Sequence, residues 1–522
     1  MVGDQRTAAG RGGVLEALEF AVLRFAVATV GNLAPTRAER IGAGLGSLYA
    51  ASVLRREGHD VAFFDAMLAE TTAEWTAALA RTAPQVAVLF EDNFNYLSKM
   101  CLLRMRAAAF DMLASARAAA IDAIVAGADA SDHADAYLDA GASVVIVGEG
   151  EETLRALADV YAKAEAKGRG RTSLFGAEEW AELGTVAGIA YRALGSLETT
   201  RTPRRRDITD LDALPRPAWD LVDVDRYRSI WRQHHGRFSM NAVTTRGCPY
   251  HCNWCAKPIW GQRYNVRSPE GTADEIAWLA SAFGAEHIWF ADDIMGLQPG
   301  WLARFAEALT ARGVRMPFKA LTRADLVLRS GEAAALRRAG CETVWIGAES
   351  GSQRILDAMD KGIRVEHIER ATAELHAVGI RVGFFLQFGY PGESRDDIER
   401  TFDLVRRCAP DDIGMSVAYP LPGTRFFERV RASLGARRNW VDSDDLAMLY
   451  RGPYSTAFYR QLHRVLHKEF RARRGVRLLR EALRRRGAAA WPSLRPAAGA
   501  LYHALTLPVA RWQLDRRQHG EV

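Results

Sequence analysis

Strands and helices alternate along most of this 522-residue chain, and that alternation limits its fold more than any other feature. From residue 239 onward, apolar stretches with the length of buried strands are each followed by a helical stretch. Because consecutive parallel strands need a crossover, a row of such units predicts a partial (β/α)6 barrel with its chemistry on the loops after the strands. The expected strands are Asn241–Thr245, His287–Ala291, Phe318–Leu321, Thr343–Gly347, Val382–Phe388 and Ile413–Ala418.

The first part of the chain shows the same alternation on a smaller scale, after a Gly-rich start over Met1–Gly13. Strand and helix in turn predict an α/β fold: a doubly wound parallel sheet covered on both faces, which binds ligands at the carboxyl ends of its strands. The expected strands are Leu23–Val30, Val61–Phe64, Val86–Phe90 and Ser143–Val147, with a helix end and strand over Ala118–Val125 and helices over Gly44–Glu57 and Glu151–Lys167.

These patterns divide the chain into four parts. We expect the α/β domain over residues 1–167, a connector over 168–238, the barrel over 239–441 and a helical C-terminal domain over 442–522. The connector is rich in Arg, Thr, Pro and Asp and has a candidate hairpin over Val186–Arg192. Ser268 and Ser394 are expected to cap the first and fifth barrel helices, with Pro269 in the first turn.

The composition is ordinary for a globular protein, with 48% hydrophobic and 25% charged residues. No apolar run approaches the roughly 20 residues that a membrane-spanning helix needs. The apolar stretch Val14–Val30 is interrupted by Glu16, Glu19 and Arg24, so it is not a signal peptide. We therefore expect a cytoplasmic protein without a transmembrane segment.

Much of the net charge of +6 lies near the C-terminus, where Glu469 and Glu481 are the only acids of the basic segment 460–486. A basic amphipathic helix of this kind could contact a membrane surface or an acidic substrate, or it could be the solvated face of a helical cap. No pattern of a known nucleic-acid module accompanies it, so no nucleic-acid partner is expected. The apolar residues at helical spacing are Phe458, Leu462, Leu466, Phe470, Leu479 and Leu483.

Three of the six cysteines, Cys248, Cys252 and Cys255, lie within eight residues in the spacing CxxxCxxC. Thiolates are the natural ligands of iron–sulfur clusters. Three thiolates on one loop can bind three irons of a 4Fe-4S cube and leave the fourth iron open to a substrate. The scattered cysteines form no disulfide framework and are expected to be buried, inert thiols. They are Cys101, Cys341 and Cys408.

Two other interpretations of this motif are weaker. A structural zinc site needs four closed ligands, usually from paired CxxC motifs, and the one nearby candidate, His251, lies between two cysteines on a short loop. Dithiol redox chemistry needs only two cysteines, and the third argues against it. The spacing therefore favours an iron–sulfur cluster.

With this loop after its first barrel strand, the chain resembles the radical S-adenosylmethionine (SAM) superfamily. The resemblance implies that a 4Fe-4S cluster and SAM bind here, with Trp254 near the adenine of SAM. Acids and glycines after the later strands match segments that hold SAM in that family, over Ala291–Asp293, Gly347–Ser352, Gln387–Glu393 and Tyr419–Thr424. The residues that the resemblance assigns to SAM are Trp254, Asp292, Asp293, Glu349, Ser350, Ser352, Gln387, Gly389 and Glu393.

The front domain is similar to the cobalamin-binding, flavodoxin-like domain found in many radical SAM enzymes, so that the likeness covers roughly residues 20 to 450. It rests on Gly44–Tyr49, Gly58–Val61 and Gly148–Thr153, which include Gly148 and Glu149. The DxHxxG motif is absent, which implies cobalamin with no protein histidine on cobalt. Asn93 and Asn95, in the segment Glu91–Leu97 after the third strand, could line the corrinoid or cap the next helix.

The resemblance implies a radical SAM methyltransferase that moves a methyl group from methylcobalamin to an unactivated carbon, or phosphorus, of a small-molecule, natural-product or lipid-like substrate. It also implies an external electron donor of flavodoxin or ferredoxin type. One alternative is a radical cyclase or rearrangement enzyme resembling the anaerobic magnesium-protoporphyrin ester cyclase. Another is a non-catalytic corrinoid or iron–sulfur protein, against which the SAM-like segments argue.

Overall fold

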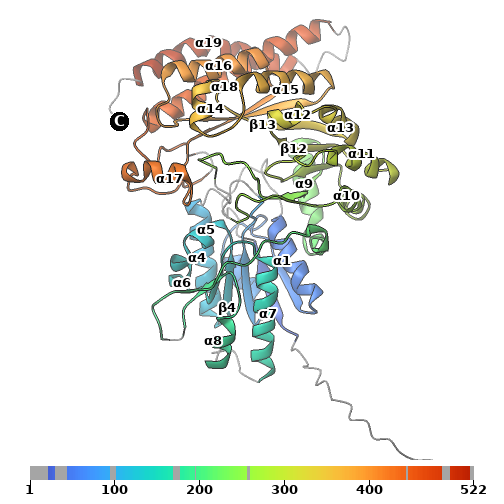
Figure 1. The fold of residues 1–522 in the computed structure, drawn as a ribbon, viewed down its shortest axis with the longest axis vertical. Coiled ribbons are helices and arrows are strands. Elements are labelled where there is room, and N and C mark those ends of the chain that lie inside the picture. The colour runs from blue at the N-terminus through green and yellow to red at the C-terminus, as the bar shows by residue number, and fades with distance from the viewer. Residues whose placement is uncertain are drawn as a thin grey trace, which may run out of the picture.

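The computed structural model describes residues 22–29, 44–94, 102–167, 177–193, 195–255, 259–442, 445–484 and 494–517. Within them the chain forms an α/β domain on one sheet, a barrel domain on a second sheet and a pair of long C-terminal helices (Figure 1). The predicted fold class is confirmed.

The front sheet has the strand order β2-β1-β3-β4-β5-β6-β7, and β1 to β5 are parallel. The order 2-1-3-4-5 of its parallel part is that of flavodoxin-like sheets. The central strand β3 (Val86–Phe90) is buried along its whole length because helices cover both faces. The other parallel strands are β1 (Arg24–Ala28), β2 (Asp60–Phe64), β4 (Asp122–Ala126) and β5 (Val144–Ile146).

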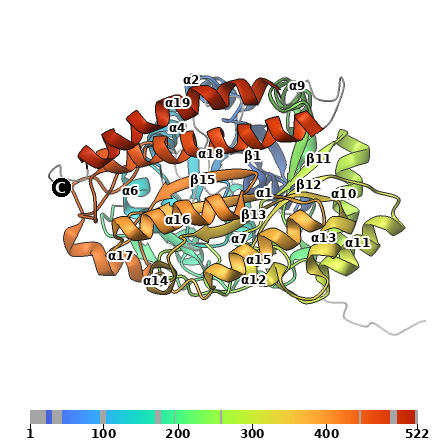
Figure 2. The same ribbon diagram turned by 90° about the horizontal axis from the view of Figure 1, so that it is seen from above.

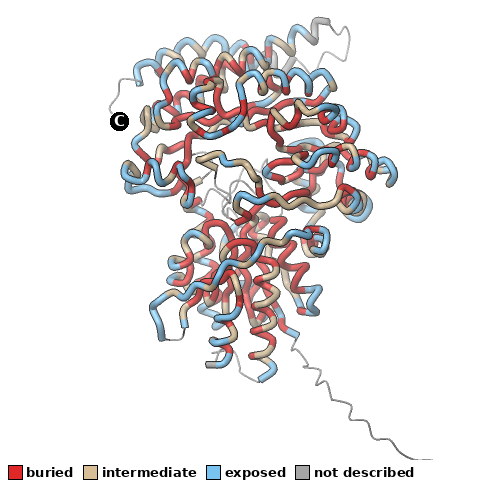
Figure 3. The backbone as a smooth tube through the Cα atoms, in the orientation of Figure 1, coloured by how far each residue is buried: buried red, intermediate tan, exposed pale blue. Residues whose placement is uncertain are grey.

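Two apolar cores lie on opposite faces of this sheet. The strands between them are mostly buried (Figure 3). Leu54 and Leu157 belong to the core under α1 and α7, and Trp75 and Leu113 belong to the core under α2 and α4. The helices are α1 (Leu45–Arg56), α2 (Ala73–Thr82), α4 (Leu103–Ala118), α5 (Ala128–Asp132), α6 (Ala134–Asp139) and α7 (Glu151–Ala166).

Part of the predicted connector joins the front sheet. After α8 (Ala177–Leu183), β6 (Ile189–Tyr191) pairs antiparallel with β5, and β7 (Thr200–Arg201) pairs antiparallel with β6. The expected hairpin therefore exists, but its second strand lies further along the chain than predicted. An antiparallel edge on a parallel sheet is a common arrangement.

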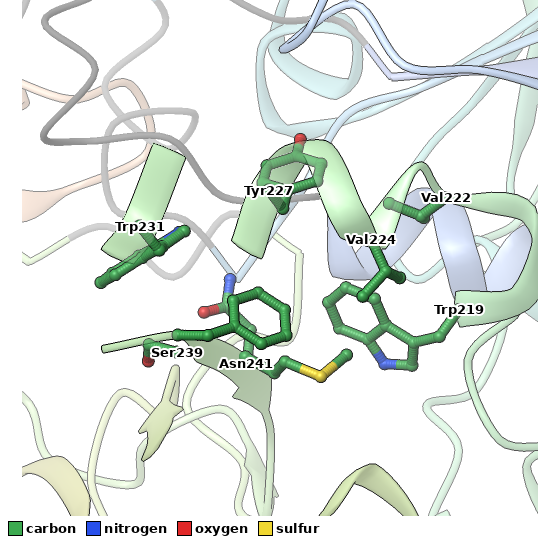
Figure 4. A pocket seen from close by; sticks show the side chains of 9 residues that line it. Trp219, Val222, Val224, Tyr227, Trp231, Ser239 and Asn241 are labelled. Atoms are coloured by element: carbon green, nitrogen blue, oxygen red, sulfur yellow. The ribbon is translucent and has the colours of Figure 1, made fainter. Parts of the chain in front are cut away.

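The rest of the connector crosses to the barrel through two short 3-10 turns and α9 (Val224–His235). The hydroxyl of Tyr227 on α9 donates to the Asp65 carboxylate after β2, at 2.9 Å. A pocket of about 10 Å³ lies between α9 and β8 (Ser239–Ala242). Its lining includes Trp219 and Val224 (Figure 4). That volume holds one water at most, so the pocket is a packing gap and not a cofactor site.

The barrel sheet is parallel throughout, in the order β15-β14-β13-β12-β11-β8. The first strand ends earlier than predicted because the carboxylate of Asp292 binds the backbone N–H groups of Thr244 and Thr245 and turns the chain away. Residues Thr245–Arg246 (β9) instead pair with Asn265–Val266 (β10). The sheet strands are β8 (Ser239–Ala242), β11 (His287–Phe290), β12 (Phe318–Thr322), β13 (Cys341–Glu349), β14 (Arg381–Phe388) and β15 (Asp412–Val417).

Helices cover the outer face of this sheet (Figure 2). The predicted caps are confirmed, because the hydroxyls of Ser268 and Ser394 accept from backbone N–H groups three residues later. The helices are α10 (Pro269–Phe283), α11 (Trp301–Ala311), α12 (Ala324–Val327), α13 (Glu332–Ala339), α14 (Gln353–Ala358), α15 (Val365–Ala377) and α16 (Arg395–Cys408).

Beyond the barrel the chain is helical, with α17 (Arg425–Val430), α18 (Thr456–Arg484) and α19 (Leu494–Arg517). The long helices α18 and α19 run side by side along one edge of the barrel domain (Figures 1 and 2). Phe458, Leu462 and Leu466 on α18 are buried in the barrel core. Among the described helices, none combines the length and apolar character needed to cross a membrane.

Candidate functional site

The three cysteines of the CxxxCxxC motif lie on one loop after β9, beyond the end of the first barrel strand, and each is half-buried. Gly247 begins this loop with φ +80°, and a Cβ there would collide with the carbonyl oxygen of Arg263, so only glycine fits. In the part of the chain that the structure describes, no three His, Cys, Asp or Glu side chains are arranged to hold a single metal ion. A cluster is a different case, because its cysteines bind different irons.

Asn253, between two of the cysteines, anchors this loop to the barrel. Its side-chain amide donates to the carbonyl oxygen of Ala358 at 2.8 Å and to the carboxylate of Asp360 at 2.9 Å. Its side-chain oxygen accepts from the Tyr390 hydroxyl at 2.8 Å, and its backbone N–H donates to the carbonyl oxygen of Met359 at 3.0 Å. These partners are about a hundred residues away in sequence, so no local pattern pointed to Asn253.

Lys361 places a buried positive charge beside the cysteine loop. Its Nζ donates to Oε1 of Glu349 at 2.8 Å and lies 5.9 Å from the centre of the Trp254 ring. Burial lowers the pKa of Lys361, but the charges of Glu349 and Cys252 raise it more, so the ammonium stays charged. A nearby cation stabilises a thiolate. Sequence reasoning missed this lysine, since nothing in its neighbours separates it from a surface lysine.

Glu349 holds this contact in an unusual backbone conformation. Its φ is +57°, and the register between β13 and β14 shifts between Gly347 and Glu349. A left-handed non-glycine residue costs roughly 1–3 kcal/mol and persists only where its surroundings hold it. A Cβ on Gly347 would lie 2.7 Å from both the Glu349 carboxylate and the Lys361 ammonium, so glycine makes room for the pair. The Glu349 carboxylate, which the sequence predicts to contact a cofactor, therefore also forms an ion pair with Lys361.

Asp292 is fully buried, and both of its carboxylate oxygens are bonded within the protein. It accepts from the backbone N–H groups of Thr244 and Thr245, each at 2.7 Å, and from their hydroxyls at 2.9 and 3.0 Å. Burial raises its pKa to about 6 against the opposing effect of these bonds. Asp292 thus ties the end of β11 to the turn that leads into the cysteine loop. Its neighbour Asp293 is exposed.

Ser350 and Ser352, also predicted to bind SAM, bond within the protein as well. The hydroxyl of Ser352 donates to Asp397 at 2.6 Å, and its backbone N–H donates to the Ser350 hydroxyl at 3.1 Å. The Ser350 hydroxyl lies 3.3 Å from that of Thr401 on α16. These bonds build the turn into α14 and fix it against α16.

Three residues predicted to bind SAM, at the end of β14, after it and on the cysteine loop, have buried polar atoms without a partner in the described part of the chain. The Oε1 atoms of Gln387 and Glu393 and the Nε1 atom of Trp254 are buried without a hydrogen-bond partner among the described residues. The other oxygen of Glu393 accepts from the Gly389 N–H at 2.7 Å, and burial raises the pKa of Glu393 to about 8. Gly389 has φ +80°. Because buried polar atoms are nearly always paired, these three atoms mark places where a polar ligand would bind.

The inner face of the barrel sheet is aromatic. Trp289 and Phe385 are 37% and 39% exposed, although both lie in the middle of strands whose neighbouring residues are buried. Trp345 stacks on Phe385 with ring centres 4.7 Å apart, and a Cβ on Gly383 would lie 2.5 Å from the Trp345 ring. Lys319 lies 3.3 Å from the centre of the Trp289 ring, and burial lowers its pKa to about 8. This face offers flat apolar contacts and one buried amine.

Arg246, directly before Gly247, joins the barrel to the front domain. Its guanidinium is fully buried and donates to Glu149 at 2.5 Å and to Glu151 at 2.7 Å. It also lies over the rings of Tyr49 and Phe94, 5.5 and 5.4 Å from their centres. The cysteine loop therefore begins at the carboxyl edge of the front sheet, where cobalamin was predicted.

Glu149 and Gly148 were predicted to contact cobalamin. Both carboxylate oxygens of Glu149 are bonded, one by Arg246 and the other by the Ile208 N–H at 2.6 Å. Burial raises the pKa of Glu149, although the Arg246 charge lowers it. Gly148 has φ +91°, and a Cβ there would lie 3.9 Å from the carbonyl oxygen of Ile259 in the barrel. Glu149 therefore joins the two domains.

Glu91 and Asn93 follow β3 at the same edge. Both are buried, and Oε2 of Glu91 and Oδ1 of Asn93 have no hydrogen-bond partner within the described ranges. Burial raises the pKa of Glu91 to about 8, together with the charge of Asp129. Asn95 and Met1–Gly13 lie outside the described residues. The described part of the segment after β3 thus offers two open oxygens to a ligand.

The two histidines of the front domain, His59 and His133, lie in different places. His59 lies at the amino end of β2, where its Nδ1 accepts from the Leu23 N–H at 3.3 Å. His133 lies between α5 and α6, 3.8 Å from Asp129. That cobalt has no histidine ligand from the protein stays a prediction.

The chain is similar to several known proteins, and one family model matches its central part. A family model described as the radical SAM superfamily matches residues 242–405. The chain is 29% identical to an uncharacterized methyltransferase of Pyrococcus horikoshii over 57% of this chain and 60% of that protein. It is 27% identical to an anaerobic magnesium-protoporphyrin IX monomethyl ester cyclase of Rubrivivax gelatinosus, over 48% of this chain and 44% of that protein. The chain thus spans less than two thirds of these two relatives.

A third relative, the hopanoid C-3 methylase of Methylococcus capsulatus, is 26% identical over 75% of this chain and 70% of its own length. Among solved structures, TsrM from Kitasatospora setae with cobalamin and a [4Fe-4S] cluster bound is similar, with a TM-score of 0.62 and 18% identity over 79% of this chain and 75% of that chain. OxsB with aqua-cobalamin and SAM bound gives a TM-score of 0.59 and 21% identity over 74% and 52%. These structures share the two-domain fold.

Proposed function

We propose that this chain, whose residues 242–405 form a radical SAM domain, is a cobalamin-dependent radical SAM methyltransferase. The observation that carries the proposal is the position of Arg246. This residue directly precedes the cysteine loop and is buried against Glu149 and Glu151 at the ligand-binding edge of the front sheet. The cluster loop and the predicted corrinoid edge therefore meet at one place.

The residues present fit three bound groups. Cys248, Cys252 and Cys255 would hold a 4Fe-4S cluster. The open atoms of Trp254, Gln387 and Glu393 would contact SAM, with Asp293, Ser350, Ser352, Glu349 and Gly389 around them. Asn93, Gly148 and, from the sequence, Asn95 would contact cobalamin. When bound, the cluster and SAM would supply hydrogen abstraction from carbon and methylcobalamin would supply the methyl group.

The chain's own residues position these groups and exclude water. Asp292 fixes the turn before the cysteine loop, Asn253 fixes the loop between Cys252 and Cys255, and Lys361 supplies a buried cation beside Cys252. At about neutral pH the protonated Glu393 can donate a hydrogen bond as well as accept one, because its pKa is raised to about 8. The aromatic inner face, with Trp289, would receive the apolar part of a small-molecule substrate.

The relatives support methyl transfer as the reaction, and they also support cyclisation as an alternative reaction. Of the three relatives by sequence, two are described as a methyltransferase and a methylase, and the third is a cyclase. A radical cyclase or rearrangement enzyme is therefore the second candidate. An external electron donor of flavodoxin or ferredoxin type and a cytoplasmic location are part of the proposal.

The test is anaerobic reconstitution of the full chain with iron, sulfide and hydroxocobalamin, followed by reduction in the presence of SAM. We expect cobalamin to co-elute with the protein and 5′-deoxyadenosine to form. The Cys252→Ala variant should lose 5′-deoxyadenosine, and Cys408→Ala, which changes a half-buried cysteine outside the loop, should keep it.

The results of this experiment test the cluster, the cobalamin and the type of reaction separately. Formation of 5′-deoxyadenosine that survives Cys252→Ala would refute the cluster assignment. A loaded cluster with no corrinoid bound would refute the cobalamin part. With substrate, a mass gain of one methyl group supports methyl transfer, and a product of unchanged or lower mass supports the cyclase alternative.

A further inference from the structure

The outer face of α19 carries a row of large apolar side chains, the apolar stripe. Leu501, Leu505, Val509 and Trp512 recur every three or four residues, and Tyr502 lies beside them. Each of the five is between 56% and 70% exposed. A helix on a protein surface normally turns charged residues outward, and a continuous exposed apolar patch marks an interaction site.

The opposite face of α19 packs against α18. Ala510 and Leu514 are buried, and the side-chain amide of Gln461 on α18 donates to the Ala510 carbonyl oxygen at 2.9 Å. The orientation of α19 is therefore fixed by α18, and the apolar stripe faces outward because the inner face is occupied.

A row of arginines runs along α18 next to the stripe. Arg464 and Arg471 are exposed, lie seven residues apart on one face of α18 and make up this arginine row. Between them, Nζ of Lys468 donates to the Thr506 hydroxyl at 2.7 Å and lies 4.7 Å from the centre of the Tyr502 ring. Because Lys468 touches the edge of α19, the arginine row and the apolar stripe share one outer surface.

We infer that this surface, the apolar stripe of α19 and the arginine row of α18, docks the protein on an anionic lipid bilayer. Apolar side chains enter the interface between headgroups and acyl chains, while the arginines pair with lipid phosphates. A second copy of the chain is a poorer occupant, because face-to-face contact would bring two arginine rows together. The inference goes beyond the proposed function and does not depend on it.

This assignment differs from the sequence prediction of membrane contact through 460–486. The apolar residues Phe458, Leu462, Leu466 and Phe470 of α18 are buried in the barrel core. Helix α18 therefore supplies charge, and the apolar contact comes from α19.

The experiment is co-sedimentation of the purified full chain with vesicles of phosphatidylcholine alone or mixed with phosphatidylglycerol, at low and high salt. We expect binding to the anionic vesicles that weakens with salt. The double variant Leu505→Ser/Trp512→Ser should bind at least about tenfold more weakly, because both side chains lose apolar burial in the interface. Leu197→Ser is the matched control, since Leu197 is 91% exposed in the front domain and should not change binding.

Three results would overturn the inference. The first is no binding to anionic vesicles, and the second is binding that the double variant leaves unchanged. The third is concentration-dependent dimerisation that the double variant abolishes while vesicles have no effect, which would make the stripe a protein interface. The readout is binding alone, so a failure here says nothing about the radical SAM activity.

Discussion

Replacing Arg246 by Met should weaken the contact between the two domains. The Arg246 guanidinium and its two partners, Glu149 and Glu151, are each less than a tenth exposed. Removing one partner from a buried ion pair leaves an uncompensated charge and typically costs about 3–5 kcal/mol. Here two carboxylates lose the same cation, so we expect Arg246→Met to lower the free energy of unfolding by at least about 3 kcal/mol.

The pH dependence of the variant's stability gives a second test, because its direction can be predicted. Without Arg246 the buried Glu149 carboxyl binds its proton more tightly in the folded chain than in the unfolded chain, because burial already raises its pKa. A folded state that holds more protons gains stability as pH falls. The difference in free energy of unfolding between the wild type and Arg246→Met should therefore become smaller as the pH is lowered from about 7 toward about 5.

The assay is urea unfolding of the cofactor-free chain, followed by circular dichroism. Arg304→Met is the matched control, because the pair of Arg304 with Glu270 is about half exposed and should contribute about 0–1 kcal/mol. The triple variant Arg246→Met/Glu149→Gln/Glu151→Gln removes the unpaired charges and should recover much of the loss. A cost below about 1 kcal/mol for Arg246→Met, or no recovery in the triple variant, would refute the reasoning.

Further predictions concern the cluster loop and the SAM site. Lys361→Met should leave Glu349 buried without its cation and should lower both stability and iron content after reconstitution, measured by urea unfolding and iron analysis. Gly247→Ala should abolish cluster assembly, read from the visible absorbance, whereas Gly313→Ala, also at positive φ but with nothing within 4 Å of its Cβ, should keep it. Glu393 has a folded pKa of about 8 against 4.5 unfolded, so the wild type should lose stability as pH rises between those values, and Glu393→Gln should flatten this loss.

The bounds of a strand could be predicted from the sequence where they depend only on the burial of its apolar residues. Val86–Phe90 is apolar throughout and forms β3 with the predicted bounds, because a strand covered on both faces needs no polar residue. The first barrel strand was displaced because the side chain that ends it, Asp292, comes from 48 residues away. A sequence pattern carries local periodicity and does not show which distant carboxylate will bind a turn.

The sequence indicated the candidate cysteines, whose cluster stays a prediction, but it did not indicate the residues that hold their loop in place. The spacing of the cysteines in the CxxxCxxC motif is enough to predict an iron–sulfur cluster. Asn253, Lys361 and Arg246 act through partners on other elements, and their neighbours in sequence give no sign of it. The contact of Glu149 with cobalamin stays a prediction, and both of its carboxylate oxygens accept hydrogen bonds from the protein.

These supports together indicate that the cysteine loop is held in place before any cofactor binds. Arg246 ties its start to the front domain, Asp292 ties the preceding turn to β11, and Asn253 ties its middle to the segment after α14. A loop fixed at three points loses little conformational entropy on binding a cluster, and it keeps a set distance from the front-sheet edge. Substitutions at these supports should therefore disturb the spacing between the two cofactor sites more than the chemical identity of either.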